Sequence, residues 1–120
     1  MNRLHSNDNE REQARKLRGL LVLLDDYASA DPTLGWVLLD ALNAPIGIGD
    51  PIEHIDSAIH LAKWMKQPVD SVLSAATVSL RDKVRNGWKS SGALTGADAA
   101  RAITAVLVRV CLAKLEGALA

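Results

Sequence analysis

The stretch "TGADAARAITAVLVRVCLAKLEGALA", residues 95–120, decides the fold. Thr95 followed three residues later by Asp98 is typical of a reciprocal cap at the start of a helix, so we expect a helix from here to near residue 120. Asp98, Arg101, Arg109 and Glu116 form its polar stripe, and roughly two-thirds of its circumference is apolar, as in a helix covered on several sides. This pattern predicts either the central helix of the fold or a helix buried against a second copy. The residues that we expect to mediate self-association are Ile103, Val106, Leu107 and Val110.

The rest of the chain also has helical periodicity, and no stretch alternates apolar and polar residues as a half-buried strand would. We expect four further helices, at about 8–29, 32–43, 51–66 and 69–87. Asp31 before Pro32 and Asp50 before Pro51 predict N-caps for the second and third helices. Pro68 predicts a break before the fourth helix, and Gly87 predicts its left-handed end. The fold class is therefore all-α, a compact single-domain bundle of about five helices over 1–120, with 1–15 as a polar extension of the first helix.

Composition argues against several classes of protein. The 120-residue chain carries 14 Lys+Arg and 14 Asp+Glu, whereas a dedicated nucleic-acid-binding domain is usually strongly basic. Its single cysteine, Cys111, permits no intramolecular disulfide. Residues 1–16 lack the apolar segment of a secretory signal, and the longest apolar run is too short to span a bilayer. We therefore expect a soluble, cytoplasmic protein that does not bind membranes.

The acidic face of the expected third helix is the first candidate site. Glu53, Asp56 and His60 fall on one side at 100° per residue, opposite Ile55 and the other apolar residues. A dinuclear metal bundle needs such residues on facing helices and projecting into the core, so we interpret this face as solvated and predict no metal. His54 lies at the edge of the apolar stripe, where we expect a hydrogen-bonded histidine.

The tryptophans lie off the apolar stripes of their own helices. Trp36 falls beside Asp40, and Trp64 falls beside His60. Because tryptophan is enriched at binding hot spots, these positions favour contact with a partner, although packing against a neighbouring helix of the same chain would also explain them. The predicted partner-binding residues are Trp36, Asp40, Glu53, Asp56, His60 and Trp64.

Two other classes stay open. A helical DNA-binding regulator could use the basic stretch "RDKVRNGWK", residues 81–89, in which an aromatic could stack on a base. Its nucleic-acid-binding residues would be Arg81, Lys83, Arg85, Trp88 and Lys89. A metal- or small-molecule-binding bundle could use His54 or His60.

Catalytic chemistry has little support. The chain has no Gly-x-Ser-x-Gly elbow, and Cys111 lies inside an apolar helix, where a raised pKa would make the thiol inert. We predict no catalytic residue and no cofactor. Residues 19–62 carry seven acidic side chains and no Lys or Arg, which predicts a partner with a basic surface. The sequence thus favours a small non-enzymatic interaction module, a regulator or inhibitor of a protein partner, that forms a homodimer.

Overall fold

The computed structural model describes residues 2–27 and 31–119, with side chains at 8–27, 31–90 and 92–118. Over these residues the chain forms five α-helices, two single turns of 3₁₀ helix and no strand, which confirms the all-α bundle. The α-helices are α1 (Asn2–Asp25), α2 (Leu34–Ala41), α3 (Ile55–Trp64), α4 (Val69–Arg85) and α5 (Gly96–Leu119). The 3₁₀ turns are η1 (Ile46–Ile48) and η2 (Ser91–Ala93).

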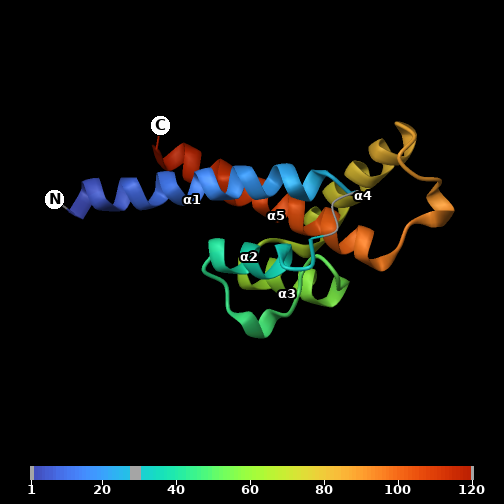
Figure 1. Ribbon diagram of the computed structural model, residues 1–120, viewed down its shortest axis with the longest axis horizontal. Helices are drawn as coiled ribbons and strands as arrows, with labels where there is room; N and C mark the ends of the chain where they lie inside the picture. The colour runs from blue at the N-terminus through green and yellow to red at the C-terminus, as the bar shows by residue number, and fades with distance from the viewer. Residues whose placement is uncertain (1, 28–30, 120) are drawn as a thin grey trace.

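Helix α5 is the centre of the fold. It packs against α1, α3 and α4, while α2 packs against α1 (Figure 1). Helices α1 and α5 run side by side in opposite directions, and α1 extends past the C-terminal end of α5 (Figure 1). This long pair makes the molecule elongated, at 54 × 30 × 28 Å.

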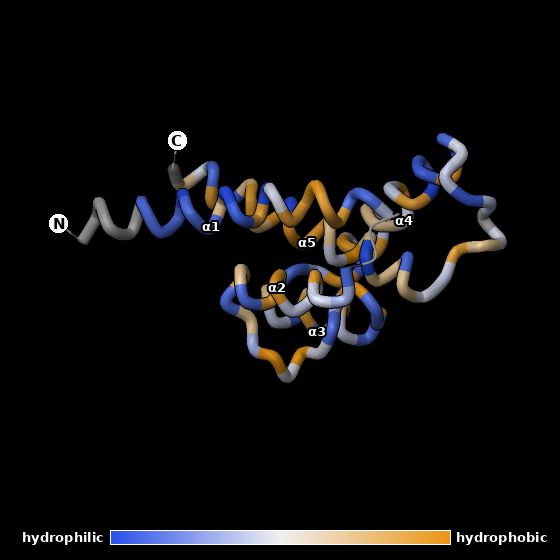
Figure 2. The backbone as a smooth tube through the Cα atoms, viewed as in Figure 1, coloured by the Kyte–Doolittle hydropathy of each residue, from blue (hydrophilic) through white to orange (hydrophobic). Residues whose placement is uncertain are grey.

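The core forms around α5, much of whose middle part has hydrophobic colours in Figure 2. Its buried side chains meet Leu17 and Leu24 of α1, Leu61 of α3 and Val72 of α4. The buried apolar residues of α5 are Ala100, Ala102, Ile103, Ala105, Leu107, Val108 and Leu112. The apolar circumference of this helix is therefore explained by its central position within one chain.

This position corrects the predicted self-association residues. Ile103 and Leu107 are 3% and 0% exposed, because α5 is covered by three other helices, so they offer no surface to a second copy. Val106 and Val110 are half-buried. The homodimer itself stays a prediction, and of the four residues only Val106 and Val110 keep some exposed surface for it.

The starts of the helices agree with the sequence at α5 and differ at α2 and α3. Thr95 and Asp98 form the reciprocal cap, since Thr95 N donates to Asp98 Oδ2 at 2.9 Å and Asp98 N donates to Thr95 Oγ1 at 3.2 Å. Asp31 instead accepts from Thr33 N at 2.9 Å, and Asp50 accepts from Ile52 N at 3.0 Å. Each aspartate closes a turn on the residue two positions later, so α2 and α3 begin three and five residues after it, at Leu34 and Ile55.

The predicted boundaries of the first helix differ from those in the structure, whereas the predicted break at Pro68 is present. Helix α1 begins at Asn2 rather than near Asp8, and it ends at Asp25, before the predicted end at Ser29, which itself lies outside the described residues. Pro68 is extended directly before α4, as predicted. Among the described residues, no helix is long and apolar enough to cross a membrane.

Three helices end in the same left-handed motif, which gives a matched test. Asn43 after α2, Lys66 after α3 and Gly87 after α4 have φ of 57°, 59° and 87°. Only glycine adopts this conformation without a steric cost from Cβ. We expect Gly87→Ala to lower the free energy of unfolding by about 1 kcal/mol and Lys66→Gly to raise it by about 0.5–1 kcal/mol. Urea denaturation followed by circular dichroism would measure both changes in the free energy of unfolding. Changes of the same sign in the two variants would contradict the prediction.

The cap of α5 predicts a dependence of stability on pH. Burial alone would raise the pKa of the Asp98 carboxyl, but hydrogen bonds from Lys89 and Thr95 outweigh it and hold that pKa below its usual value. A depressed pKa stabilises the fold above about pH 4, the unfolded-state value, and this contribution is lost as the pH falls through the folded-state pKa. We expect Asp98→Asn to cost about 1–2 kcal/mol at pH 7, and the difference from wild type to shrink below about pH 4. Urea denaturation from pH 7 to 3 measures both, and a pH-independent difference would contradict the assignment.

Candidate functional site

The basic stretch 81–89 is largely used inside the molecule. Lys83 Nζ donates to Asp25 O at 2.9 Å and lies 4.7 Å from the centre of the Tyr27 ring. The Trp88 ring meets Tyr27 edge-on, with ring centres 4.6 Å apart. Lys89 Nζ donates to Asp98 Oδ2 at 2.9 Å.

These contacts bear on the predicted nucleic-acid patch, which stays a prediction. Lys83 on α4, and Trp88 and Lys89 after it, contact the end of α1 and the start of α5, so these half-buried side chains are partly engaged within the molecule. Burial raises the pKa of Tyr27 to about 12, which agrees with its enclosed position in this cluster. Arg81 and Arg85 are exposed on α4. These two cations could meet phosphates, but the predicted mode of binding also needs an aromatic ring, Trp88, to stack on a base.

The acidic cluster predicted on the third helix is exposed but spread out. Asp56, His60 and Trp64 lie on α3, whose packing face is Ala58, Leu61 and Ala62, while Glu53 lies in the turn before the helix. His54 is exposed and extended directly before α3, and its side chain makes no capping hydrogen bond there, in contrast to the hydrogen-bonded histidine that we expect from the sequence. Within the described part of the chain, no three His, Cys, Asp or Glu side chains gather in a way that could hold a metal ion.

The structure separates the six predicted partner-binding residues into two places. Trp36 and Asp40 lie on α2, which packs against α1. The other four lie on or just before α3, which packs against α5, α4 and η1. The predicted contact surface would therefore have to span both helices, and it stays a prediction.

Exposed apolar side chains gather where α2 meets α1. Eight large apolar side chains in the described residues are more than one-third exposed, and five of them belong to α1, α2 and η1. These five are Val22, Leu23, Trp36, Val37 and Ile46, with exposures from 41% to 77%, and all of them except Val22 line one of two apolar hollows. Contact with water does not stabilise such a group, so a gathered set points to contact with another molecule.

Two apolar hollows shape this region. One, of about 500 Å³, lies between the helices and is lined by Leu20 and Leu23 of α1 and Val37 of α2. The other, of about 370 Å³, is lined by Trp36 and Ile46. Asp40 borders both, because Trp36 and Val37 lie four and three residues before it on α2. We call this region, consisting of Lys16, Gly19, Leu20, Leu23, Trp36, Val37, Asp40, Ala41, Ala44 and Ile46, the α1–α2 surface.

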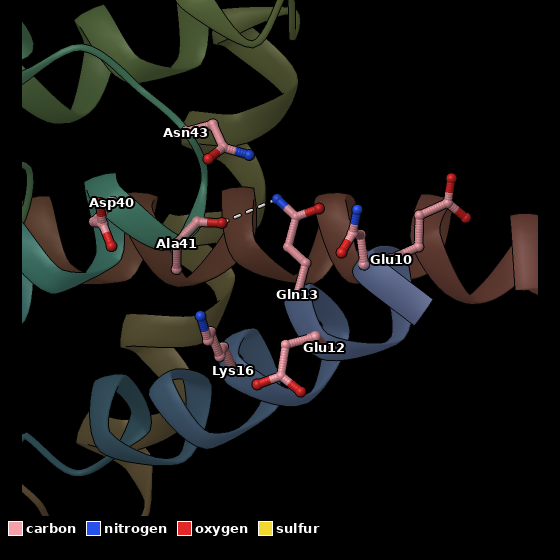
Figure 3. Close-up of a pocket in the computed structure, with 8 residues that line it drawn as sticks. Glu10, Glu12, Gln13, Lys16, Asp40, Ala41 and Asn43 are labelled. Atoms are coloured by element: carbon pink, nitrogen blue, oxygen red, sulfur yellow. Dashed lines mark hydrogen bonds between the residues drawn. The ribbon is translucent and has the colours of Figure 1, made fainter. Parts of the chain in front are cut away.

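A polar hollow of about 320 Å³ continues the α1–α2 surface toward the N-terminal part of α1 (Figure 3). It is lined by Glu10, Glu12 and Asn43, and it shares Lys16 and Asp40 with the apolar hollow between the helices. Gln13 Nε2 donates to Ala41 O at 2.9 Å and ties α1 to the end of α2 (Figure 3). Together the hollows form a groove with one apolar end and one polar end.

The sequence of α2 explains why Trp36 and Val37 face outward. Leu34, Leu38 and Leu39 point into the core, so the residues between them lie on the outer side. The start of α2 is fixed by Gly35, where a Cβ would overlap the Asp50 carboxylate, 2.7 Å from its carbon. No side chain larger than hydrogen fits between α2 and this turn, and the position of Trp36 follows from that close approach.

The sequence interpretation found the α2 side of this surface and missed the α1 side. Trp36 and Asp40 were predicted, whereas Lys16, Leu23 and Ile46 were not. The available signal was the run "LLVLLD", residues 20–25, which holds more apolar residues than one helix stripe can bury.

Comparison with protein-family models, curated proteins and solved structures finds no match for this chain. The site is an apolar groove with charges at its edge, on an all-α bundle. Cys111 does not line it; this residue lies on α5, where burial raises the pKa of its thiol.

Proposed function

We propose that this chain is a non-enzymatic protein-interaction module that binds an apolar helix of another polypeptide on the α1–α2 surface. The observation that carries the proposal is the gathering of Trp36, Val37, Leu23 and Ile46 around two neighbouring hollows. Apolar anchors in pockets, with tryptophan among them, supply most of the affinity in many protein interfaces. A groove between two helices is also a common receptor for a third, amphipathic helix.

The dimensions and charges of the groove define the partner. From Asn9 to Leu23 it runs along about 21 Å of α1, at 1.5 Å per residue, which matches a helix of about four turns. The partner helix needs apolar residues at spacings of three and four, to fill the hollows at Leu23 and Trp36. It needs a basic residue at the end that meets Glu10, because a like charge there would oppose binding; the Glu12 carboxylate is already paired with Arg15. When this chain binds, it would cover the apolar face of the partner helix, and this is how it would regulate or inhibit the partner.

Gly19 offers a direct test of this surface. It lines the apolar hollow, and a Cβ added there would meet no heavy atom within 4 Å. Gly19→Trp therefore fills the groove without disturbing the core. Gly117 on α5 is equally open but lines none of the three hollows, so Gly117→Trp is the matched control.

The measurement is selection of helical peptides on the immobilised wild-type protein from a displayed library of sequences about four helical turns long. We expect the selected peptides to have apolar residues at helical spacing and a basic end. Their affinity in solution, measured by fluorescence anisotropy, should fall at least about tenfold with Gly19→Trp and remain within about twofold with Gly117→Trp. Selected peptides that bind the Gly19→Trp variant as well as wild type, or no enrichment at all, would refute the proposal.

A further inference from the structure

The two walls of the groove carry complementary side chains. The α1 wall has Lys16 and Leu23, and the α2 wall has Asp40 and Val37. Lys16 and Asp40 also share the polar hollow, so they lie at one level of the groove, and Lys16 extends from α1 toward α2 (Figure 3). A cation therefore lies across from an anion, and leucine and valine share the apolar end.

We propose that a second copy of this chain is an occupant of the α1–α2 surface, related to the first by a two-fold axis that runs along the groove. This inference rests on the proposed function, because it uses the same surface as a docking site. A two-fold axis in the plane of contact places each wall of one copy on the opposite wall of the other. Lys16 of each copy then meets Asp40 of the other, and Leu23 meets Val37.

The polar end supports the same symmetry. Glu10 lies on the α1 wall and Asn43 follows α2, so the axis along the groove brings the Glu10 carboxylate toward the Asn43 amide, while the Glu12 carboxylate is already paired with Arg15 of its own chain. A foreign partner must supply these complementary groups, whereas a second copy has them by symmetry. Self-association then covers the surface that the partner needs, so the dimer and the partner complex exclude each other.

Charge inversion tests the contact between Lys16 and Asp40. Both side chains are exposed, so Lys16→Glu and Asp40→Lys leave the core unchanged. In a dimer of either variant, two pairs of like charges meet across the axis. In the mixed dimer, the carboxylate introduced by Lys16→Glu meets the amine introduced by Asp40→Lys, and the natural Lys16 meets the natural Asp40. Within each variant chain the like charges stay together, so only exchange between copies can restore association.

The experiment is sedimentation equilibrium of the full chain over a range of concentrations, at low salt. We expect wild type and the control Lys114→Glu, which changes an exposed cation outside the groove, to approach twice the monomer mass. Each groove variant alone should show a dimer dissociation constant raised at least about tenfold, and an equimolar mixture of the two should return to the wild-type value.

Three results would overturn the inference: a wild-type monomer at the highest concentration, a groove variant that dimerises like wild type, or a mixture no better than its components. The proposed function is judged separately, by the selected peptides. Peptides sensitive to Gly19→Trp together with a monomeric wild type would leave the proposed function standing and refute the dimer. Restored association in the mixture without any selected peptide would support the dimer and refute the binding of other helices.

Discussion

Replacing Leu107 with alanine is expected to lower the free energy of unfolding by about 3–4 kcal/mol. The side chain is fully buried on α5, the helix that α1, α3 and α4 all contact. Truncation removes its apolar contacts and leaves a cavity that three packed helices cannot close. Urea denaturation should show a lower midpoint with an unchanged slope, since the surface exposed on unfolding is nearly the same.

Trp64→Ala is the comparison for this variant. Trp64 is 41% exposed at the end of α3, so its truncation should cost much less stability than that of Leu107. The sequence predicts that Trp64→Ala disturbs association more than folding, and light scattering of the folded variant measures this. If Leu107→Ala kept full stability and lost only self-association, α5 would be an interface rather than the centre of the fold.

The sequence predicts the helices well because their information is local. The periodicity, the Thr95–Asp98 cap and the left-handed Gly87 each depend on residues within a few positions of one another. The starts of α2 and α3 depend on a finer choice. Asp31 and Asp50 each precede a proline, as an N-cap would, but each carboxylate binds the backbone two residues later, and the helix begins only after that turn.

The candidate site is only half predictable for a different reason. A single-sequence pattern shows which residues of one helix share a side, but not which neighbour covers that side. Trp36 stands out on α2 because it lies off the apolar stripe. Leu23 lies in a run of apolar residues, and its 41% exposure depends on α2 being too short to cover it.

Arg101 is the clearest case in which tertiary structure changes the meaning of a residue. From the sequence it belongs to the polar stripe of the last helix, yet it is only 8% exposed. Its guanidinium donates to the carbonyl oxygens of Leu24 at 2.8 Å, Leu23 at 2.6 Å and Asp26 at 3.0 Å. These groups lie at the C-terminal end of α1, where carbonyls lack partners within the helix and a cation also favours the helix dipole.

We therefore expect Arg101→Met to lower the free energy of unfolding by about 2–4 kcal/mol, because methionine keeps much of the volume but leaves buried carbonyls without donors. Arg109→Met is the matched control on the same helix. Arg109 binds the Asp25 carboxylate at 2.7 Å, but its side chain is 43% exposed, so its removal should cost less than about 1 kcal/mol.

Hydrogen exchange would locate the effect of Arg101→Met. The amides in the last turn of α1 should lose protection before those in the middle of α5, because the cap holds that turn. Equal losses of stability in Arg101→Met and Arg109→Met would mean that charge near the end of α1, rather than the buried hydrogen bonds, fixes its contact with α5. A larger loss in Arg101→Met would show that the buried hydrogen bonds of this arginine help to hold the end of α1, which forms one wall of the groove, against the central helix.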